Sequence, residues 1–192
     1  MQPIEKIRQT IFSIQPLTDE EWKKHEESLT PAKFRKGEFL IKAGQIETNM
    51  YYLAKGLCRN YFVSNEREFT VDFHFEGDFV TGFYSLITGA PSPVNIVFLE
   101  DSDVLILPIK QIQEFYAESI NINRLGRRMA EFHYIKRLEK EMELLSLTAE
   151  ERYAKLLNRK PEFVRAISVK HLSSYLGIQP ESLSRIRKSF SA

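Results

Sequence analysis

The stretch LSSYLGIQPESLSRIRK, residues 172–188, constrains the fold more than any other part of the chain. Leu172 and Leu176 lie one helical turn apart, and Gly177 follows where a helix often ends with a left-handed residue. On the second helix, the Leu183 side chain would face back onto the first helix. This order of apolar and small residues around a glycine predicts a helix-turn-helix.

The second helix of this pair would carry polar and charged side chains outward. Glu181 and Arg185 are four residues apart, so they project from one face. Arg can donate two hydrogen bonds to guanine, and Glu can accept one from cytosine. The alternative is a surface ion pair, worth about 0.3–0.5 kcal/mol. Within a helix-turn-helix we favour base reading. The predicted DNA contacts are Ser168, Lys170, Gln179, Glu181, Ser182, Ser184, Arg185 and Lys188.

Two kinds of contact are expected among these residues. Ser168 is predicted to cap the first helix. Lys170 and Lys188, together with His171 and Arg187, are predicted to face phosphates, which position a protein on DNA without specifying a sequence.

The charge distribution agrees with a nucleic-acid-facing module at the end of the chain. Residues 151–192 hold nine Lys and Arg against three Asp and Glu, a net charge of +6, whereas the whole chain carries +1. The preceding part is therefore mildly acidic. Such asymmetry suggests a basic module on an acidic body, and chance clustering on a solvated surface is the alternative.

Residues 34–108 have a different pattern, which consists of short apolar or alternating runs such as FRKGEFLIKAGQ and NIVFLEDSDVLILP. Gly37, Gly44, Gly56 and Gly77 punctuate these runs at close intervals. Repeated short strands with turn signals predict an antiparallel sandwich or barrel.

Helices are expected on both sides of this region. Residues 1–29 are predicted to be helical, and Thr18 with Glu21 has the pattern of a capping box. A short helix is expected in IKQIQEFYAESINI after Pro108. Thr148 with Glu151 predicts a second capping box, and Pro161 is expected to end that helix.

A longer helix is predicted at residues 121–145, because apolar residues recur there at gaps of three or four. The stripe could cover the barrel or pair with its twin in a dimer, and periodicity alone does not separate the two. The stripe consists of Leu125, Met129, Phe132, Ile135, Leu138, Met142 and Leu145.

Several classes of protein are disfavoured by composition. Cys58 is the only cysteine, so neither an internal disulfide nor a cysteine-based metal cluster is expected, and Cys58 is predicted to be a buried strand residue. No apolar run approaches the ~18 residues of a membrane span, and a secretory signal is not expected. A cytoplasmic setting without a membrane partner follows.

An enzyme is also not expected. A metal-dependent cupin enzyme would need a cluster of His and carboxylate ligands inside the barrel, and the barrel region holds only His74. The sequence shows no Ser/His/Asp arrangement, Gly-rich phosphate loop or HExxH pattern. No metal site or cofactor is predicted.

Taken in order along the chain, these features resemble a Crp/Fnr-type transcriptional regulator. FRKGEFLIKAGQ, MYYLAKGLCRNYF, FEGDFV and LEDSDVLILP resemble the cyclic-nucleotide-binding β-roll of that family. The apolar stripe lies where the family has its dimerisation helix, and SVKHLSSYLGIQPESLSRIRK resembles its DNA-binding motif. The resemblance covers nearly the whole chain after about Thr30.

The resemblance implies an α+β fold: an N-terminal antiparallel β-roll or jelly-roll barrel, a long dimerisation helix and a C-terminal helix-turn-helix domain. We expect boundaries at 1–118, 119–146 and 147–192. The dimer interface would consist of Leu125, Met129, Phe132, Ile135, Leu138 and Met142.

The loop that cradles the cyclic phosphate in cAMP-binding relatives departs from the family pattern. Gly82 is followed by Phe83 instead of Glu, and Ser92, Pro93 and Val94 stand where Arg is expected. Residues 80–98 contain no Lys or Arg. A phosphate buried without a cation is costly, so we expect poor cAMP binding.

Other effectors are left open by the sequence. Phe83, Tyr84, Ser85, Ser92 and Asn95 could line a pocket for an unidentified small molecule, or they could be core and loop residues. The iron–sulfur branch of the family needs several cysteines, which this chain lacks. His74 could serve as a haem ligand, but a polar strand residue is the more ordinary interpretation.

The sequence thus predicts a dimeric, sequence-specific transcriptional regulator that binds double-stranded DNA at a two-fold-symmetric site and does not respond to cAMP. For an activator, RNA polymerase would be a further partner. The alternative function is a ligand-binding or protein-interaction adaptor on the same fold. The sequence specifies neither the effector, nor the target genes, nor the direction of regulation.

Overall fold

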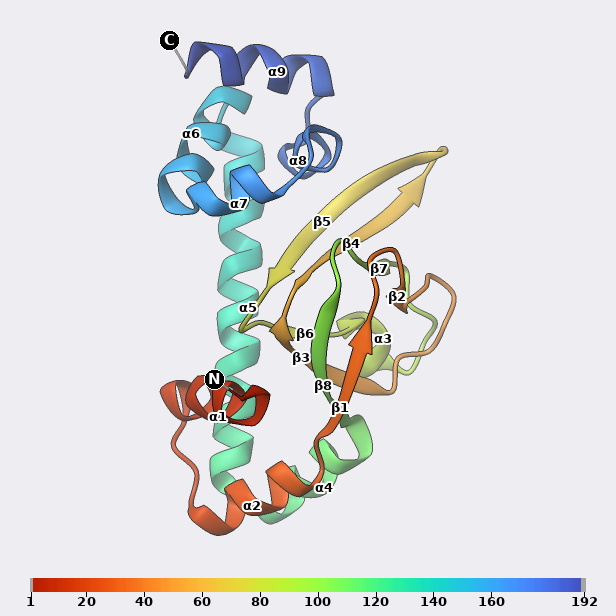
Figure 1. The fold of residues 1–192 in the computed structure, drawn as a ribbon, viewed down its shortest axis with the longest axis vertical. Coiled ribbons are helices and arrows are strands. Elements are labelled where there is room, and N and C mark those ends of the chain that lie inside the picture. The colour runs from red at the N-terminus through yellow and green to blue at the C-terminus, as the bar shows by residue number, and fades with distance from the viewer. Residues whose placement is uncertain (1, 191–192) are drawn as a thin grey trace. The chain divides into compact units, whose positions relative to one another are not determined.

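The computed structural model describes residues 2–190 (Figure 1). The helices of the N-terminal and central parts are α1 (Pro3–Ile14), α2 (Asp19–Glu27), α3 (Phe83–Thr88), α4 (Ile109–Glu118) and α5 (Ile120–Ser146). The C-terminal helices are α6 (Ala149–Arg159), α7 (Pro161–Ala166), α8 (Val169–Leu176) and α9 (Pro180–Ser189). The strands are β1 (Thr30–Phe34), β2 (Phe39–Ile41), β3 (Asn49–Lys55), β4 (Leu57–Ser64), β5 (Arg67–Phe75), β6 (Phe79–Val80), β7 (Asn95–Phe98) and β8 (Ser102–Pro108).

The strands form two four-stranded sheets, in the orders β1-β8-β3-β6 and β2-β7-β4-β5. Tyr51 of β3 pairs with Ile106 of β8 on one side and with Val80 of β6 on the other, both antiparallel. Cys58 of β4 pairs with Phe98 of β7. The predicted antiparallel β-roll is therefore confirmed.

The turn between β3 and β4 requires a glycine. Gly56 has a φ of +119°, and a Cβ placed there would lie 2.0 Å from Ser102 Oγ on β8. Both the left-handed backbone and the close approach of β8 exclude a larger residue.

The space between the two sheets is filled by side chains from both of them, among them Leu53, Cys58, Ile96 and Phe98. The neighbouring positions on β3 point to the opposite face, as the two-residue period of a strand requires. Cys58 is fully buried, as predicted.

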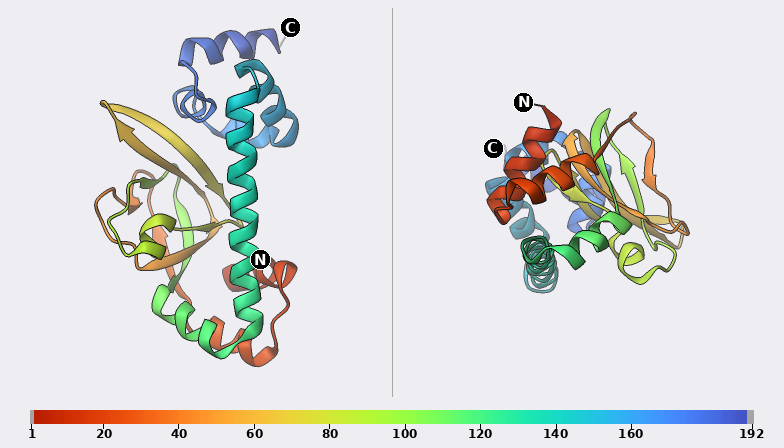
Figure 2. Two further views of the ribbon diagram at one scale, coloured as in Figure 1. Left: turned by 180° about the vertical axis from the view of Figure 1, so that it is seen from behind. Right: turned by 90° about the horizontal axis from the view of Figure 1, so that it is seen from below.

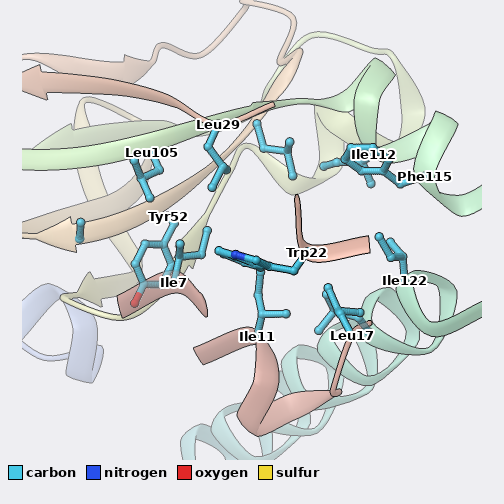
Figure 3. Packing of buried hydrophobic residues seen from close by; sticks show 13 residues of the cluster. Ile7, Ile11, Leu17, Trp22, Leu29, Tyr52, Leu105, Ile112, Phe115 and Ile122 are labelled. Carbon is cyan, nitrogen blue, oxygen red and sulfur yellow. The ribbon is translucent and has the colours of Figure 1, made fainter. Parts of the chain in front are cut away.

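The opposite face of β3 and β8 is covered by helices. Tyr52 and Leu105 pack there against Ile11 of α1, Trp22 of α2 and Ile122 of α5. Figure 3 shows the Trp22 side chain in the middle of this cluster, close to Ile11. The protein therefore has a second hydrophobic core, between this sheet and the helices, in addition to the core between the two sheets.

The predicted capping boxes are present. The Thr18 hydroxyl accepts a hydrogen bond from the backbone N–H of Glu21, whose carboxylate accepts one from the N–H of Thr18. Thr148 and Glu151 make the same reciprocal pair at the start of α6. Pro161 was expected only to end a helix, and here the expectation is incomplete. α6 stops at Arg159, and Pro161 begins α7, because proline is well suited to a first helical turn.

The chain divides into two compact units. One comprises the chain up to Phe62 together with Asp72–Glu131, and the other comprises Val63–Val71 and the chain from Phe132 onward. The division falls inside α5, which Figure 2 shows as one continuous helix. The expected boundaries at 118/119 and 146/147 lie at the two ends of that helix, and this division into domains stays a prediction.

The apolar stripe of α5 has two environments. Leu125 is buried in the helix-covered core, and Met129 packs against the same core. From Phe132 onward the apolar side chains are exposed, with Phe132 at 65%, Ile135 at 55% and Met142 at 52%. The stripe therefore covers the roll in its first half and is open in its second. None of the described helices is long and apolar enough to cross a membrane.

Candidate nucleic-acid interface

Helices α8 and α9 form the predicted helix-turn-helix. The Ser168 hydroxyl accepts a hydrogen bond from the backbone N–H of His171 and so caps α8, as predicted. Gly177 ends the helix in the left-handed conformation with a φ of +70°. Figure 1 shows α8 almost end-on and α9 lying across the view, so the two helices cross steeply.

The packing between the two helices uses the expected apolar residues. Leu172, Leu176 and Leu183 are at most 3% exposed, and Ser173 between them is also buried. The N–H of Ile178 donates to the carbonyl of Ser173 at 3.0 Å, which closes the turn after Gly177. Each sequence position used to predict the motif thus has the predicted place.

The outer face of α9 holds the predicted base-reading residues. Gln179, Glu181, Ser184, Arg185 and Lys188 are exposed, and Ser182 is half-buried. Among the residues that the structure describes, no ion pair joins Glu181 to Arg185. The Arg185 guanidinium instead donates to the Ser182 hydroxyl at 3.4 Å, a weak contact that a base edge could replace.

The four residues predicted to face phosphates differ in exposure. Lys170 and Lys188 are exposed. Arg187 is half-buried and donates from Nη2 to the carbonyl of Val164 at 3.0 Å. His171 is half-buried as well, and its carbonyl accepts from the Thr70 hydroxyl at 3.5 Å. Arg187 therefore contacts the backbone of α7 within the module, and the phosphate contacts of all four residues stay predictions.

Helix α8 also contacts the first residues of strand β5. The Ser174 hydroxyl accepts from the N–H of Thr70 and donates to the carbonyl of Glu68, both at 2.9 Å. Lys140 of α5 donates to the carbonyl of Val71, and its ammonium lies 3.6 Å from the centre of the Tyr175 ring. Strand β5, α5 and α8 thus share one polar contact region.

The five residues that could line an effector pocket lie in different environments. Phe83 and Tyr84 on α3 are more than half exposed. Ser85 is fully buried, and its hydroxyl accepts from the N–H of Glu47 at 2.9 Å. The Ser92 hydroxyl bonds to both backbone groups of Val94. Asn95 accepts from the N–H of Ala43 through its side-chain carbonyl. The polar groups of this set hold loops in place.

A buried carboxylate lies beside the loop that departs from the cAMP-binding pattern. Glu47 is 5% exposed and accepts from the N–H groups of Thr48 and Asn49 at 3.0 Å and of Gly82 at 3.4 Å. Burial raises the pKa of Glu47 above its ordinary value, and these hydrogen bonds oppose that rise. Glu47 was not predicted as a buried residue, because nothing in its spacing along the sequence distinguishes it from a surface carboxylate.

Cys58 does not have the environment of a reactive group. Burial raises the pKa of the Cys58 thiol, which keeps the thiol protonated. His74 is a buried residue of β5. The described residues contain no group of three His, Cys, Asp or Glu side chains that could hold a metal ion.

The β-roll is similar to a known family of domains. Residues 31–119, which run from β1 to the end of α4, match the family model of the cyclic nucleotide-binding domain. A search of curated proteins finds no match to the chain.

Several solved structures share the fold of almost the whole chain. FixK2 from Bradyrhizobium japonicum superposes with a TM-score of 0.74 at 21% identity over 85% of this chain and 84% of that one. CLP from Xanthomonas campestris, described as a c-di-GMP responsive global regulator, gives 0.70 at 14% identity, covering 91% and 92%. A protein from Eubacterium rectale assigned to the crp/fnr family of transcriptional regulators gives 0.70 at 18% identity, covering 91% and 84%.

Proposed function

We propose that this chain, which has the fold of Crp/Fnr-type regulators and a β-roll that matches the cyclic nucleotide-binding domain, is a sequence-specific DNA-binding transcriptional regulator. The observation that carries the proposal is the outer face of α9. Glu181 and Arg185 project from a helix whose inner face is fixed by Leu183 against α8. A recognition helix needs this combination of a rigid support and exposed hydrogen-bonding groups.

The active form in this proposal is a homodimer. Phe132, Ile135, Leu138 and Met142 lie along one side of α5 and are 41–65% exposed. A row of exposed apolar residues of this kind marks an interaction site. Two copies joined along α5 would present two recognition helices to the half-sites of a two-fold-symmetric operator, about 34 Å apart.

The β-roll in this proposal does not respond to cAMP. The loop from Val80 to Phe98 offers no cation to a phosphate. Near its start, the carboxyl group of Glu47 accepts from the N–H of Gly82, so this backbone donor already has a partner. A cyclic phosphate would therefore lack the positive partner that its burial requires.

Selection of genomic DNA fragments by the purified protein, at moderate salt and without added ligand, tests the proposal. The double variant Glu181→Ala/Arg185→Ala removes the two base-reading groups. Its matched control is Glu162→Ala/Arg165→Ala, which removes one acid and one base from the exposed surface of α7. We expect the wild type and the control to recover one shared two-fold-symmetric sequence, and the α9 variant to lose it.

Recovery of only unrelated fragments by the wild type would leave two outcomes, which a second selection with small-molecule cell extract separates. A symmetric sequence that appears only with extract shows that an effector is required. Failure in both selections refutes the regulator function. The adaptor alternative predicts protein binding with little salt dependence, whereas DNA binding through several phosphates weakens steeply as salt rises.

A further inference from the structure

One guanidinium connects the end of α5 to the turn of the helix-turn-helix. Arg152 lies in the second turn of α6. Its Nε and Nη2 atoms donate to the carbonyl of Leu176 at 3.2 and 2.9 Å, and its Nη1 atom donates to the carbonyl of Leu147. The planar fork of an arginine can hold two acceptors in a fixed relation, which a lysine cannot do.

The two carbonyls lie at the C-terminal ends of α5 and α8. Leu147 follows α5 directly, and Leu176 is the last residue of α8, immediately before Gly177. Carbonyls at the end of a helix have no partner within it, and a cation there interacts favourably with the helix dipole. Arg152 satisfies one such group at each helix end.

Side-chain contacts reinforce the same junction. Glu143 of α5 pairs with Lys155 and Arg159 of α6, at 2.7 and 3.7 Å. Leu144 lies against the turn, since its Cδ2 atom is 3.6 Å from the position that a Cβ on Gly177 would occupy. The end of α5 therefore contacts both α6 and the corner between α8 and α9.

This geometry sets the direction of α9 relative to α5. In a dimer joined along α5, the distance and rotation between the two recognition helices depend on that direction. Adjacent half-site spacings differ by one base pair, which shifts and rotates one half-site relative to the other. A small change at the corner is therefore enough to alter which spacing fits.

Resting on the proposed function, we propose that Arg152 is a positioning residue that fixes the half-site spacing of the operator without touching DNA. The loss of its three hydrogen bonds would free the α8–α9 corner from the end of α5. Recognition of a single half-site would survive, because α9 keeps its own support from α8.

The test uses the half-site found by genomic selection, placed once alone and once as an inverted pair whose spacing varies by single base pairs. Full-length wild type, Arg152→Met and Arg152→Lys are compared by DNA affinity. Arg165→Met is the matched control, because Arg165 is an exposed arginine on α7 of the same module. Thermal unfolding and sedimentation report whether each variant folds and dimerises.

We expect the wild type and Arg165→Met to prefer one spacing. Arg152→Met should reduce the preference for that spacing over its neighbours by about tenfold, with single half-site affinity unchanged within about twofold. Arg152→Lys keeps the positive charge but lacks the planar fork, so its spacing preference should lie between those of the wild type and Arg152→Met. If Arg152→Met does not fold, Arg152→Lys provides the test.

Two results would overturn the inference while the proposed function stands. In the first, the Arg152 variants keep the wild-type spacing preference. In the second, they lose affinity for single and paired half-sites equally, which is the signature of a merely structural role. A wild type that prefers no paired site would overturn the proposed function as well.

Discussion

His25 on α2 is a buried histidine without a hydrogen-bond partner among the described residues. Neither ring nitrogen is paired, and the ring lies between Trp22 and Phe115, with centroids 5.8 and 5.9 Å away. Burial lowers the pKa of His25 from 6.5 to about 4. The folded protein therefore keeps His25 neutral at a pH where the unfolded chain protonates it.

This shift has a defined effect on stability. The unfolded state binds the extra proton below pH 6.5, and the folded state binds it only near pH 4. The free energy of unfolding should therefore fall as pH decreases through this window, by about 2 kcal/mol between about pH 7.5 and pH 5 from His25 alone. Denaturant unfolding at a series of pH values measures the fall.

The variant His25→Phe isolates this contribution from other titrating groups. It keeps an aromatic ring between Trp22 and Phe115 and removes two unpaired polar atoms, so it should stabilise the fold by about 1 kcal/mol near neutral pH. The gap between the variant and the wild type should widen as pH falls. A constant gap would show that His25 does not titrate in this window.

Residue roles were predictable where a local rule fixes them. Ser168, Gly177 and the two capping boxes follow from how a helix begins and ends, and the structure shows each in its expected role. His25, Glu47 and Arg152 were missed, because a charged or polar residue has no local pattern that shows what will cover it after folding.

At the scale of elements, the packing of α4 against α5 depends on a glycine in mid-helix. A Cβ on Gly126 would lie 2.2 Å from the Tyr116 hydroxyl oxygen and 2.7 Å from its ring carbon Cζ. Tyr116 is 38% exposed, so its ring lies over the α5 backbone at the edge of the core. Glycine destabilises the interior of a helix relative to alanine, but here it allows the Tyr116 ring to approach the α5 backbone closely.

The sign of a Gly126→Ala change should therefore depend on Tyr116. In the wild-type background the new methyl group displaces the ring, and we expect lower stability. In a Tyr116→Ala background the space is open, and the same change should stabilise the chain by about 1 kcal/mol through helix propensity alone. Chemical denaturation of the four proteins gives the double-mutant cycle, and equal effects in both backgrounds would contradict the contact.

The order of the elements was largely predictable, and the exceptions have physical causes. Helix α3 within the strand region was not expected, because its six residues, FYSLIT, are too few to show a helical period. α7 was missed since Pro161 signals a helix end as readily as a helix start. The sequence could not show that the first half of the α5 stripe is buried and the second half exposed. Packing on the roll and pairing in a dimer both need the same apolar spacing.

At the scale of the whole molecule, the exposed half of the α5 stripe predicts dependence of DNA binding on dimerisation. Ile135→Asp places a charge in the apolar row, where a partner would bury it without compensation. We expect a monomer by sedimentation velocity and loss of binding to the paired operator. Arg137→Asp, on the opposite side of the same helix, is the control and should remain dimeric. A dimeric Ile135→Asp protein would place the interface elsewhere.

Salt dependence should separate positioning contacts from reading contacts on the same module. Lys170 is exposed on α8 and is proposed to face a phosphate, so Lys170→Gln in both subunits should reduce the slope of log affinity against log salt by about 2. The loss of DNA affinity in this variant should be similar for the preferred sequence and for variants of that sequence.

Glu181→Ala should leave the salt slope unchanged. It should reduce the discrimination between bases at one base pair of each half-site, by about 1–3 kcal/mol. Titration of wild-type and single-base-variant operators at several salt concentrations measures both effects. If Lys170→Gln altered base preference, or Glu181→Ala altered the slope, the assigned roles would be exchanged and α8 would be the helix that reads the groove.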